Sequence, residues 1–101
     1  MVKLKPTFNR NGYCHKIVWR DENYAITELS DIDSDKFVCY EAYRVQVKKS
    51  GHPNSTAEYP RETTPRDEDW GKKGYSVWDL QTAHDKINLL RKKYGNKKHK
   101  R

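Results

Sequence analysis

Apolar and polar residues alternate along the first half of the chain, and this alternation predicts β-strands. Residues 13–20 and 24–29 alternate on either side of the polar cluster Asp21–Asn23, which indicates a β-hairpin with a three-residue loop. Residues 1–12 are polar and end in Asn11-Gly12, so we expect a lead-in that closes in a turn.

Residues 36–49 carry the longest strand pattern of the chain. One face of this expected strand is predicted to point into the core, interrupted by Glu41, and holds Phe37, Cys39, Tyr43, Val45 and Val47. The other face mixes apolar and cationic groups, is expected to be half-exposed, and holds Val38, Tyr40, Ala42, Arg44, Gln46 and Lys48.

Residues 50–73 form a long connection that contains three prolines and two glycines. Loops of this length in small domains are usually functional or flexible. Within the connection, Thr64-Pro65-Arg66-Asp67 predicts a single helical turn, with Thr64 as N-cap and Pro65 in the first helical position. Residues 74–78 are expected to form a short strand.

A one-sided apolar stripe after this strand predicts an amphipathic helix. Asp79 is expected to cap the helix, and Gly95 to end it just after Tyr94. The stripe recurs at spacings of three and four residues and consists of Leu80, Ala83, Ile87, Leu90 and Tyr94.

The expected order of elements is β-β-β, long loop, β, α. The simplest arrangement is an α+β fold, in which an antiparallel sheet of about four strands has one C-terminal amphipathic helix packed on one face. We expect residues 1–95 to form a single domain and residues 96–101 to be a basic tail that is disordered on its own. The second face of the sheet would stay partly open as a ligand platform.

The expected core is thin. Leu, Ile, Val and Phe make up only 17 of the 101 residues, and such a low share is typical of disordered chains. Seven Tyr and three Trp offset this shortage of apolar side chains. We expect modest stability. A partner protein, or a second copy of the chain in a homo-oligomer, would be one way to complete the core.

Two cysteines, Cys14 and Cys39, are too few for a disulfide scaffold. We expect two half-buried free thiols, with a disulfide or a metal pair as the alternatives. No apolar run approaches the length of a membrane span, and the N-terminus has no apolar stretch typical of a signal peptide. We therefore expect an intracellular protein without membrane contact.

Positive charge is concentrated at the C-terminus. The chain has 21 Lys+Arg and 14 Asp+Glu, yet its last eleven residues contain seven cations and no acid, which leaves a charge-balanced body. Such a cluster is an electrostatic hook for the phosphates of nucleic acid. Tyr40, Arg44 and Lys48 on the expected open face are suited to stacking bases and binding phosphates. The predicted C-terminal contacts are Arg91, Lys92, Lys93, Lys97, Lys98, Lys100 and Arg101.

Signals for catalysis are few. The four histidines are spread over an expected strand, loop, helix and tail, and no metalloprotease, nucleophile-elbow or phosphate-loop motif is present. The acidic cluster Asp67, Glu68 and Asp69 lacks a second cluster at a useful spacing, and we interpret it as a solvated face that neutralises nearby cations. We therefore expect a protein that is not an enzyme and that has neither a cofactor nor a metal.

Two segments carry a resemblance to known proteins. They are Phe37–Val47, with the sequence F-V-C-Y-E-A-Y-R-V-Q-V, and Pro65–Leu80, with the sequence P-R-D-E-D-W-G-K-K-G-Y-S-V-W-D-L. Together with the helix that follows, they resemble small uncharacterised proteins of bacterial viruses and mobile elements over roughly residues 36–90. Such proteins have no assigned chemistry, and the resemblance implies a location in the host cytoplasm or in the virion.

The C-terminal part carries a second resemblance. Strands that run into a helix and then into Lys92-Lys93-Tyr94-Gly95-Asn96 are similar to nucleic-acid-binding domains of the W-G-R type, which end in K-x-G-N. The W-G-R tripeptide itself is missing, and Tyr43-Arg44-Val45 stands near its place. No nucleic-acid contact is therefore carried over from that family.

Two candidate functions follow for this small binding protein. The first is sequence-tolerant binding of nucleic acid, either RNA or DNA, through the basic helix end and tail. The second is a virus-encoded protein-interaction module, either a virion accessory or an inhibitor of a host protein, that docks through residues 50–73. Tyr59, Trp70 and the acids Asp67, Glu68 and Asp69 would be its centre. Alternatively, Trp70 folds back onto the sheet and fills the thin core.

Overall fold

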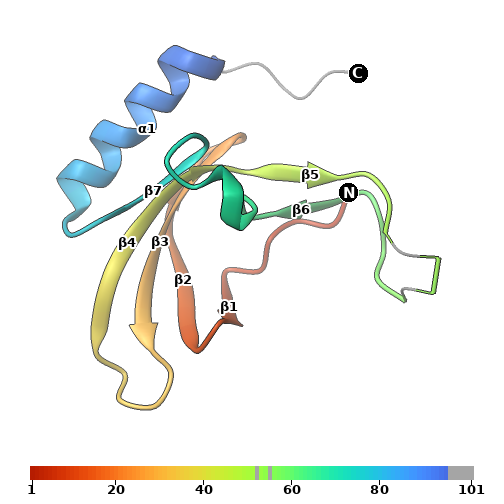
Figure 1. Ribbon diagram of the computed structural model, residues 1–101, viewed down its shortest axis with the longest axis horizontal. Helices are drawn as coiled ribbons and strands as arrows, with labels where there is room; N and C mark the ends of the chain where they lie inside the picture. The colour runs from red at the N-terminus through yellow and green to blue at the C-terminus, as the bar shows by residue number, and fades with distance from the viewer. Residues whose placement is uncertain (52, 55, 96–101) are drawn as a thin grey trace.

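The computed structural model describes residues 1–51, 53–54 and 56–95. Its elements in chain order are β1 (Thr7–Arg10), β2 (Tyr13–Arg20), β3 (Tyr24–Asp31), β4 (Phe37–Arg44), β5 (Gln46–Lys48), β6 (Arg61–Thr63), the 3-10 turn η1 (Asp67–Asp69), β7 (Gly74–Val77) and α1 (Leu80–Tyr94). A five-stranded antiparallel sheet has the order β1-β2-β3-β4-β7, and β5 and β6 form a separate pair (Figure 1). The fold is therefore α+β, as predicted, with one more strand in the main sheet than the expected four.

The hairpin of β2 and β3 has the predicted three-residue loop. The Asp21 carboxylate accepts hydrogen bonds from the backbone N–H groups of Asn23 (2.9 Å) and Tyr24 (2.8 Å), which fixes the turn. The prediction of a lead-in over residues 1–12 was wrong for Thr7–Arg10, which pair with β2 through a turn at Asn11 and Gly12. Sequence alternation missed this edge strand because it has only four residues, of which Phe8 alone is apolar.

The helix forms as the sequence predicts. The Asp79 carboxylate accepts a hydrogen bond from the backbone N–H of Thr82 at 2.8 Å, and Gly95 ends the helix with a positive φ of 81°. Of the predicted stripe, Ala83, Ile87 and Leu90 are buried, whereas Leu80 is 42% exposed.

The helix covers the opposite face of β4 from the one predicted. Ala42 belongs to the helix-side core, which consists of Tyr24, Ile26, Ala42, Val77, Ala83, Ile87 and Leu90. The face with Tyr43 and Val45 is also covered, because Trp70 and Leu4 pack against it. When both faces of a strand are buried, the alternation of its residues cannot show which face the helix covers. For this reason the prediction of an open sheet face was wrong.

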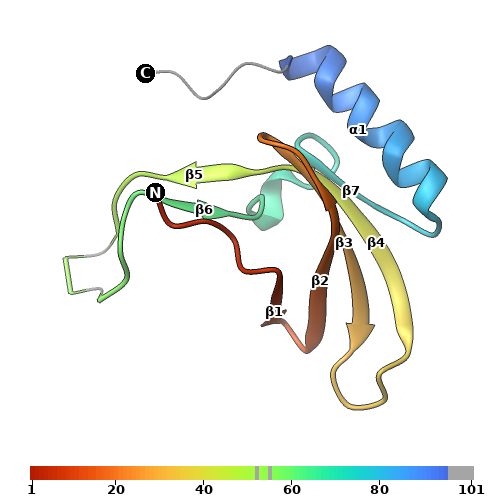
Figure 2. The same ribbon diagram turned by 180° about the vertical axis from the view of Figure 1, so that it is seen from behind.

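The predicted strand over residues 36–49 breaks at Val45. This residue is 2% exposed, and its backbone N–H donates to the carbonyl of Asn23 at 2.8 Å. The chain then leaves the main sheet as β5, which pairs with β6 on the side of the sheet away from α1 (Figures 1 and 2).

The long connection is partly ordered by β6 and by the helical turn η1. The turn lies where predicted, but Arg66 rather than Thr64 is its N-cap residue, without a side-chain cap. No helix among the described residues is both long and apolar enough to cross a membrane.

Candidate nucleic-acid interface

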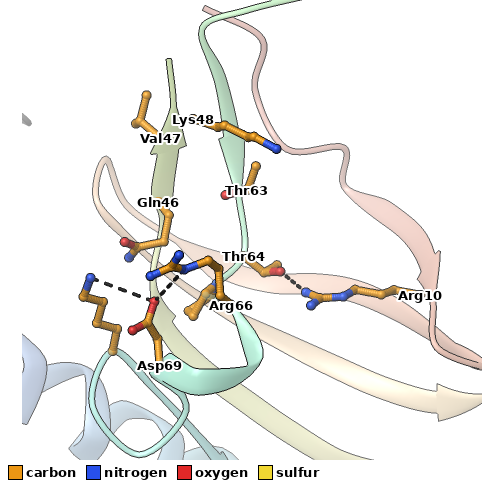
Figure 3. Close-up of a pocket in the computed structure, with 10 residues that line it drawn as sticks. Arg10, Gln46, Val47, Lys48, Thr63, Thr64, Arg66 and Asp69 are labelled. Atoms are coloured by element: carbon orange, nitrogen blue, oxygen red, sulfur yellow. Dashed lines mark hydrogen bonds and ion pairs between the residues drawn. The ribbon is translucent and has the colours of Figure 1, made fainter. Parts of the chain in front are cut away.

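A cation-lined hollow of about 530 Å³ opens beside the β5–β6 pair (Figure 3), and we call it the basic groove. Four of its lining side chains are cationic, and one is a carboxylate. The complete lining is Arg10, Gln46, Val47, Lys48, Thr63, Thr64, Pro65, Arg66, Asp69 and Lys73. The groove thus brings together cations from β1, β5, the region around η1 and the turn before β7.

Local interactions set the positions of these cations. Arg10 donates to the hydroxyl of Thr64 and lies 3.5 Å from Asp67, which ties β1 to the segment after β6. Asp69 lies 3.6 Å from Arg66 and 4.0 Å from Lys73, as the dashed lines in Figure 3 mark. Each pair lies at the surface, although the Asp69 side chain is half-buried, and surface ion pairs typically contribute about 0–1 kcal/mol, so an incoming anion can compete for the cations.

A second hollow, of about 370 Å³, adjoins the basic groove and shares Arg10, Thr63 and Thr64 with it. Its cationic lining residues are Lys3, Lys5, Arg10 and Arg61, and Glu62 is its one carboxylate. The two hollows together present seven cationic residues around β6.

The Glu62 carboxylate is already neutralised within the protein. Its oxygens accept hydrogen bonds from Arg20 (2.8 Å) and from the backbone N–H of Leu4 (3.0 Å), and Lys3 lies 3.6 Å away. Burial alone would raise the pKa of Glu62, but these bonds and charges outweigh it and hold the pKa below its usual value. The buried acid therefore subtracts little from the positive potential outside.

Acidic residues gather at the other end of the sheet. Asp31, Asp33 and Asp35 lie in or beside the turn that joins β3 to β4, far from the β5–β6 pair (Figure 1). The acids Asp67, Glu68 and Asp69 lie on the groove side and pair with its cations, so the separation of charge in three dimensions is partial. This separation is invisible in the sequence, because the groove residues are spread from position 10 to position 73.

The structure separates the residues that the sequence grouped as nucleic-acid contacts. Lys48 lines the basic groove, but Arg44 lies 5.1 Å from the Tyr94 ring on the helix side, and Tyr40 packs 5.0 Å from Phe37. A shared open surface of Tyr40, Arg44 and Lys48 was therefore a wrong prediction.

The predicted helix-end contacts also differ from one another. Arg91 pairs with Asp21 and lies 5.6 Å from the Trp19 ring, so it supports the fold, whereas Lys92 and Lys93 are exposed. The four remaining predicted contacts lie outside the described residues; they are Lys97, Lys98, Lys100 and Arg101.

Trp70, the proposed centre of a protein interface, is partly buried and packs back onto the sheet. Its ring centroid lies 6.1 Å from that of Tyr43, and Gly74 leaves room for the ring, since a Cβ there would overlap it. Trp70 thus covers the second core, as the alternative interpretation predicted. Tyr59 likewise lies against Gly51, where a Cβ would overlap the phenol.

Among the other predicted interface residues, Asp67 and Glu68 are exposed and Asp69 is half-buried. Asp67 and Asp69 make the contacts with groove cations described above, and Glu68 lies 2.9 Å from Arg66. The interpretation that this acidic cluster neutralises nearby cations agrees with these contacts.

The two cysteines are free thiols, as predicted. Cys14 is half-buried, as expected, whereas Cys39 is buried. Burial raises the pKa of the Cys39 thiol, and the Glu41 charge adds to this effect, so the thiol is a poor nucleophile at neutral pH. Within the described residues, no group of three or more His, Cys, Asp or Glu side chains has the arrangement of a metal site.

Sequence reasoning also missed an exposed tryptophan. Trp78, between β7 and α1, is 78% exposed, the largest exposed fraction among the large hydrophobic side chains described. The pattern placed it in a short strand, where an aromatic residue is usual, and gave no signal of its exposure.

The chain matches no protein-family model, and comparison with curated proteins and with solved structures gives no significant match. The resemblance to small proteins of bacterial viruses therefore stays a prediction.

Proposed function

We propose that this protein binds single-stranded nucleic acid, with little dependence on sequence, by holding the phosphate backbone in the basic groove. The observation that supports this proposal is the cation-rich lining of the groove, in which four cationic side chains face one carboxylate. Phosphates are bound by such cations with release of counterions, which makes affinity steeply dependent on salt.

The shape and chemistry of the groove favour a strand over a duplex. The groove is a concave hollow bounded by β1, the β5–β6 pair and the segment around η1, and a hollow of this kind suits a single flexible backbone. Thr63, Thr64 and Gln46 add neutral hydrogen-bonding groups beside the cations, which suits a flexible backbone that bends into a hollow.

The C-terminal cations extend this binding surface in our proposal. Lys92 and Lys93 are exposed on the last turn of α1, and four further cations follow in the sequence. We assign them a supporting electrostatic role and the groove the positioning role.

Salt-dependent binding of a labelled oligonucleotide tests this proposal. Affinity for a single strand of about twelve nucleotides, within the usual site sizes, is measured at several salt concentrations. Lys48→Gln is expected to weaken binding and to reduce the salt slope by about 0.7–0.9, the contribution of one phosphate contact.

Lys36→Gln is the matched control. Lys36 is also an exposed lysine, but it lies in the turn between β3 and β4, outside the groove. Equal effects of the two substitutions would mean that only net charge matters and would contradict a groove site. Tighter binding to duplex than to single strand would contradict the choice of ligand.

A protein-interaction role is the second candidate, favoured by the exposure of Trp78 rather than by residues 50–73. Aromatic anchors of this kind often dominate interfaces. If a second copy covers Trp78, the sedimentation mass should double as the protein concentration rises, and Trp78→Ala should restore the monomer.

A further inference from the structure

A small hollow beside the basic groove contains a buried histidine and a glutamate that the proposed function leaves unused. It measures about 160 Å³, and Arg10 lines both the hollow and the groove. His15 is 5% exposed, and its Nδ1 has no hydrogen-bond partner among the described residues. Glu41 also lines the hollow, with its Oε1 3.7 Å from His15 Nδ1. Because buried polar atoms are nearly always paired, the unpaired nitrogen points to a missing hydrogen-bond partner.

His15 and Glu41 present two acceptors to this hollow. Burial lowers the pKa of His15, and the backbone carbonyl of Arg10 opposes this effect while the Arg10 guanidinium adds to it, so the imidazole is neutral at pH 7. A separation of 3.7 Å is too long for a hydrogen bond from Nδ1 to Glu41. The imidazole donates to the Arg10 carbonyl while Nδ1 has no partner, so we assign the imidazole proton to Nε2. Nδ1 is then an acceptor, as are the oxygens of the Glu41 carboxylate; burial raises the pKa of this carboxyl, and the Arg10 charge opposes the shift.

These two acceptors fit a planar amino group. Such a group carries two hydrogens, and acceptors 3.7 Å apart lie within reach of both. The volume is close to that of a cavity of about 150 Å³ that holds one benzene ring, so it suits one six-membered ring better than a purine. Leu29, Tyr13 and Trp70 supply apolar and aromatic lining for the faces of the ring.

We propose that this hollow binds a cytosine base of the strand held in the basic groove, with the 4-amino group donating to Glu41 and His15. This inference rests on the proposed function and adds to it one position where a base is read. Thymine and uracil carry a carbonyl oxygen in place of that amino group, and this oxygen would face the Glu41 carboxylate. Arg10, at the junction of the hollow and the groove, is placed to contact the phosphate of the same nucleotide.

The test compares oligonucleotides of about twelve deoxycytidines and about twelve deoxythymidines at one salt concentration. The unaltered protein should bind the cytosine strand about tenfold to a hundredfold more tightly, as expected for a hydrogen bond to a charged group. Glu41→Gln should reduce this preference to within about threefold, because the amide can also donate to the thymine oxygen.

Glu28→Gln is the control, since it removes the same charge from the neighbouring strand at a residue that does not line the hollow. This variant should keep the full preference for cytosine. A thermal unfolding curve shows whether the Glu41→Gln variant is folded. If it is not, the affinities of the unaltered protein for the two strands test the cytosine pocket by themselves.

Equal affinity of the unaltered protein for both strands would overturn the cytosine pocket and leave the groove intact. A preference that survives Glu41→Gln in a folded protein would overturn the role of Glu41 and with it the pocket. Failure to bind either strand would overturn the proposed function together with this inference.

Discussion

Leu89 and Leu90 are neighbours in the sequence with opposite surroundings. Leu90 is fully buried against the sheet, whereas Leu89 is 47% exposed. Leu90→Ala should therefore lower the free energy of unfolding by about 2–5 kcal/mol, the usual result of removing a buried leucine side chain. Leu89→Ala is the matched control and should stay within about 0.5 kcal/mol of the original. Denaturant unfolding measures both, and equal losses would mean that this face of the helix is misassigned.

Trp70 allows a second test at the residue scale. Because its ring covers Tyr43 on the face of the sheet away from α1, Trp70→Ala should reduce stability by about 1–3 kcal/mol. Thermal unfolding provides the measurement. An unchanged midpoint together with loss of a protein partner would instead support the interface interpretation of Trp70.

Residue-level predictions succeeded where one physical rule dominates. The spacing of Ile87 and Leu90 was enough to place them in the core, because a surface helix buries one stripe. The same reasoning failed for Arg44, because β4 is buried on both faces and its alternation fits either orientation. His15 and Glu41 gave no signal, since their proximity depends on neighbouring strands rather than on spacing in the chain.

At the scale of elements, partly buried ion pairs attach β6 and the N-terminal segment to the main sheet. Glu62 on β6 receives hydrogen bonds from Arg20 on β2 and from the backbone of Leu4. Asp21 and Arg91 join the β2–β3 loop to α1 in the same way. For Asp21, burial raises the pKa, but the Arg91 bond and two backbone N–H groups outweigh it and leave the pKa lowered.

Because the pKa values of these carboxyl groups are lowered in the folded protein, the fold loses stability at acidic pH. Because the pKa of Glu62 is lower in the folded state than its usual value of 4.5, its contribution is complete above that pH and is lost as the pH falls through the folded-state pKa. Glu62→Gln should therefore be less stable at pH 7 and show a flatter loss of stability below about pH 4.5. Unfolding curves between neutral and acidic pH measure this, and an unchanged acid slope would contradict the role of Glu62.

The sequence predicted elements with strong local signals and missed those that depend on distant pairing. Asp79 and Gly95 mark the two ends of α1 correctly, because caps act within one turn. Strands β1, β5 and β6 are short, and their positions depend on backbone pairing with partners far along the chain or across a loop. The basic groove is built from these short elements, so its location could not be predicted either.

At the scale of the whole molecule, the fold brings together cations that lie far apart along the chain. The cations around β6 lie at one end and Asp31, Asp33 and Asp35 at the other. The sequence identified the basic C-terminus, because those cations are consecutive or nearly so, but it could not reveal cations that only folding brings together.

Deletion of residues 96–101 tests how the tail and the groove share the binding. This deletion removes Lys97, Lys98, Lys100 and Arg101, so the salt slope for oligonucleotide binding should fall by up to about 3–4. Salt-dependent binding should persist, because the groove remains. Complete loss of binding would mean that the tail, and not the groove, is the binding site. An unchanged salt slope would mean that the tail makes no phosphate contacts.

The most direct test of the central claim is an NMR titration of the isotope-labelled protein with a short single-stranded oligonucleotide. If the basic groove holds the strand, the largest backbone amide shifts should fall on Gln46–Lys48 and on Thr63, Thr64 and Arg66. The turn between β3 and β4 should stay unchanged, because it lies at the acidic end of the molecule. Shifts confined to the last turn of α1 and the residues after it, with none in the groove, would contradict the claim.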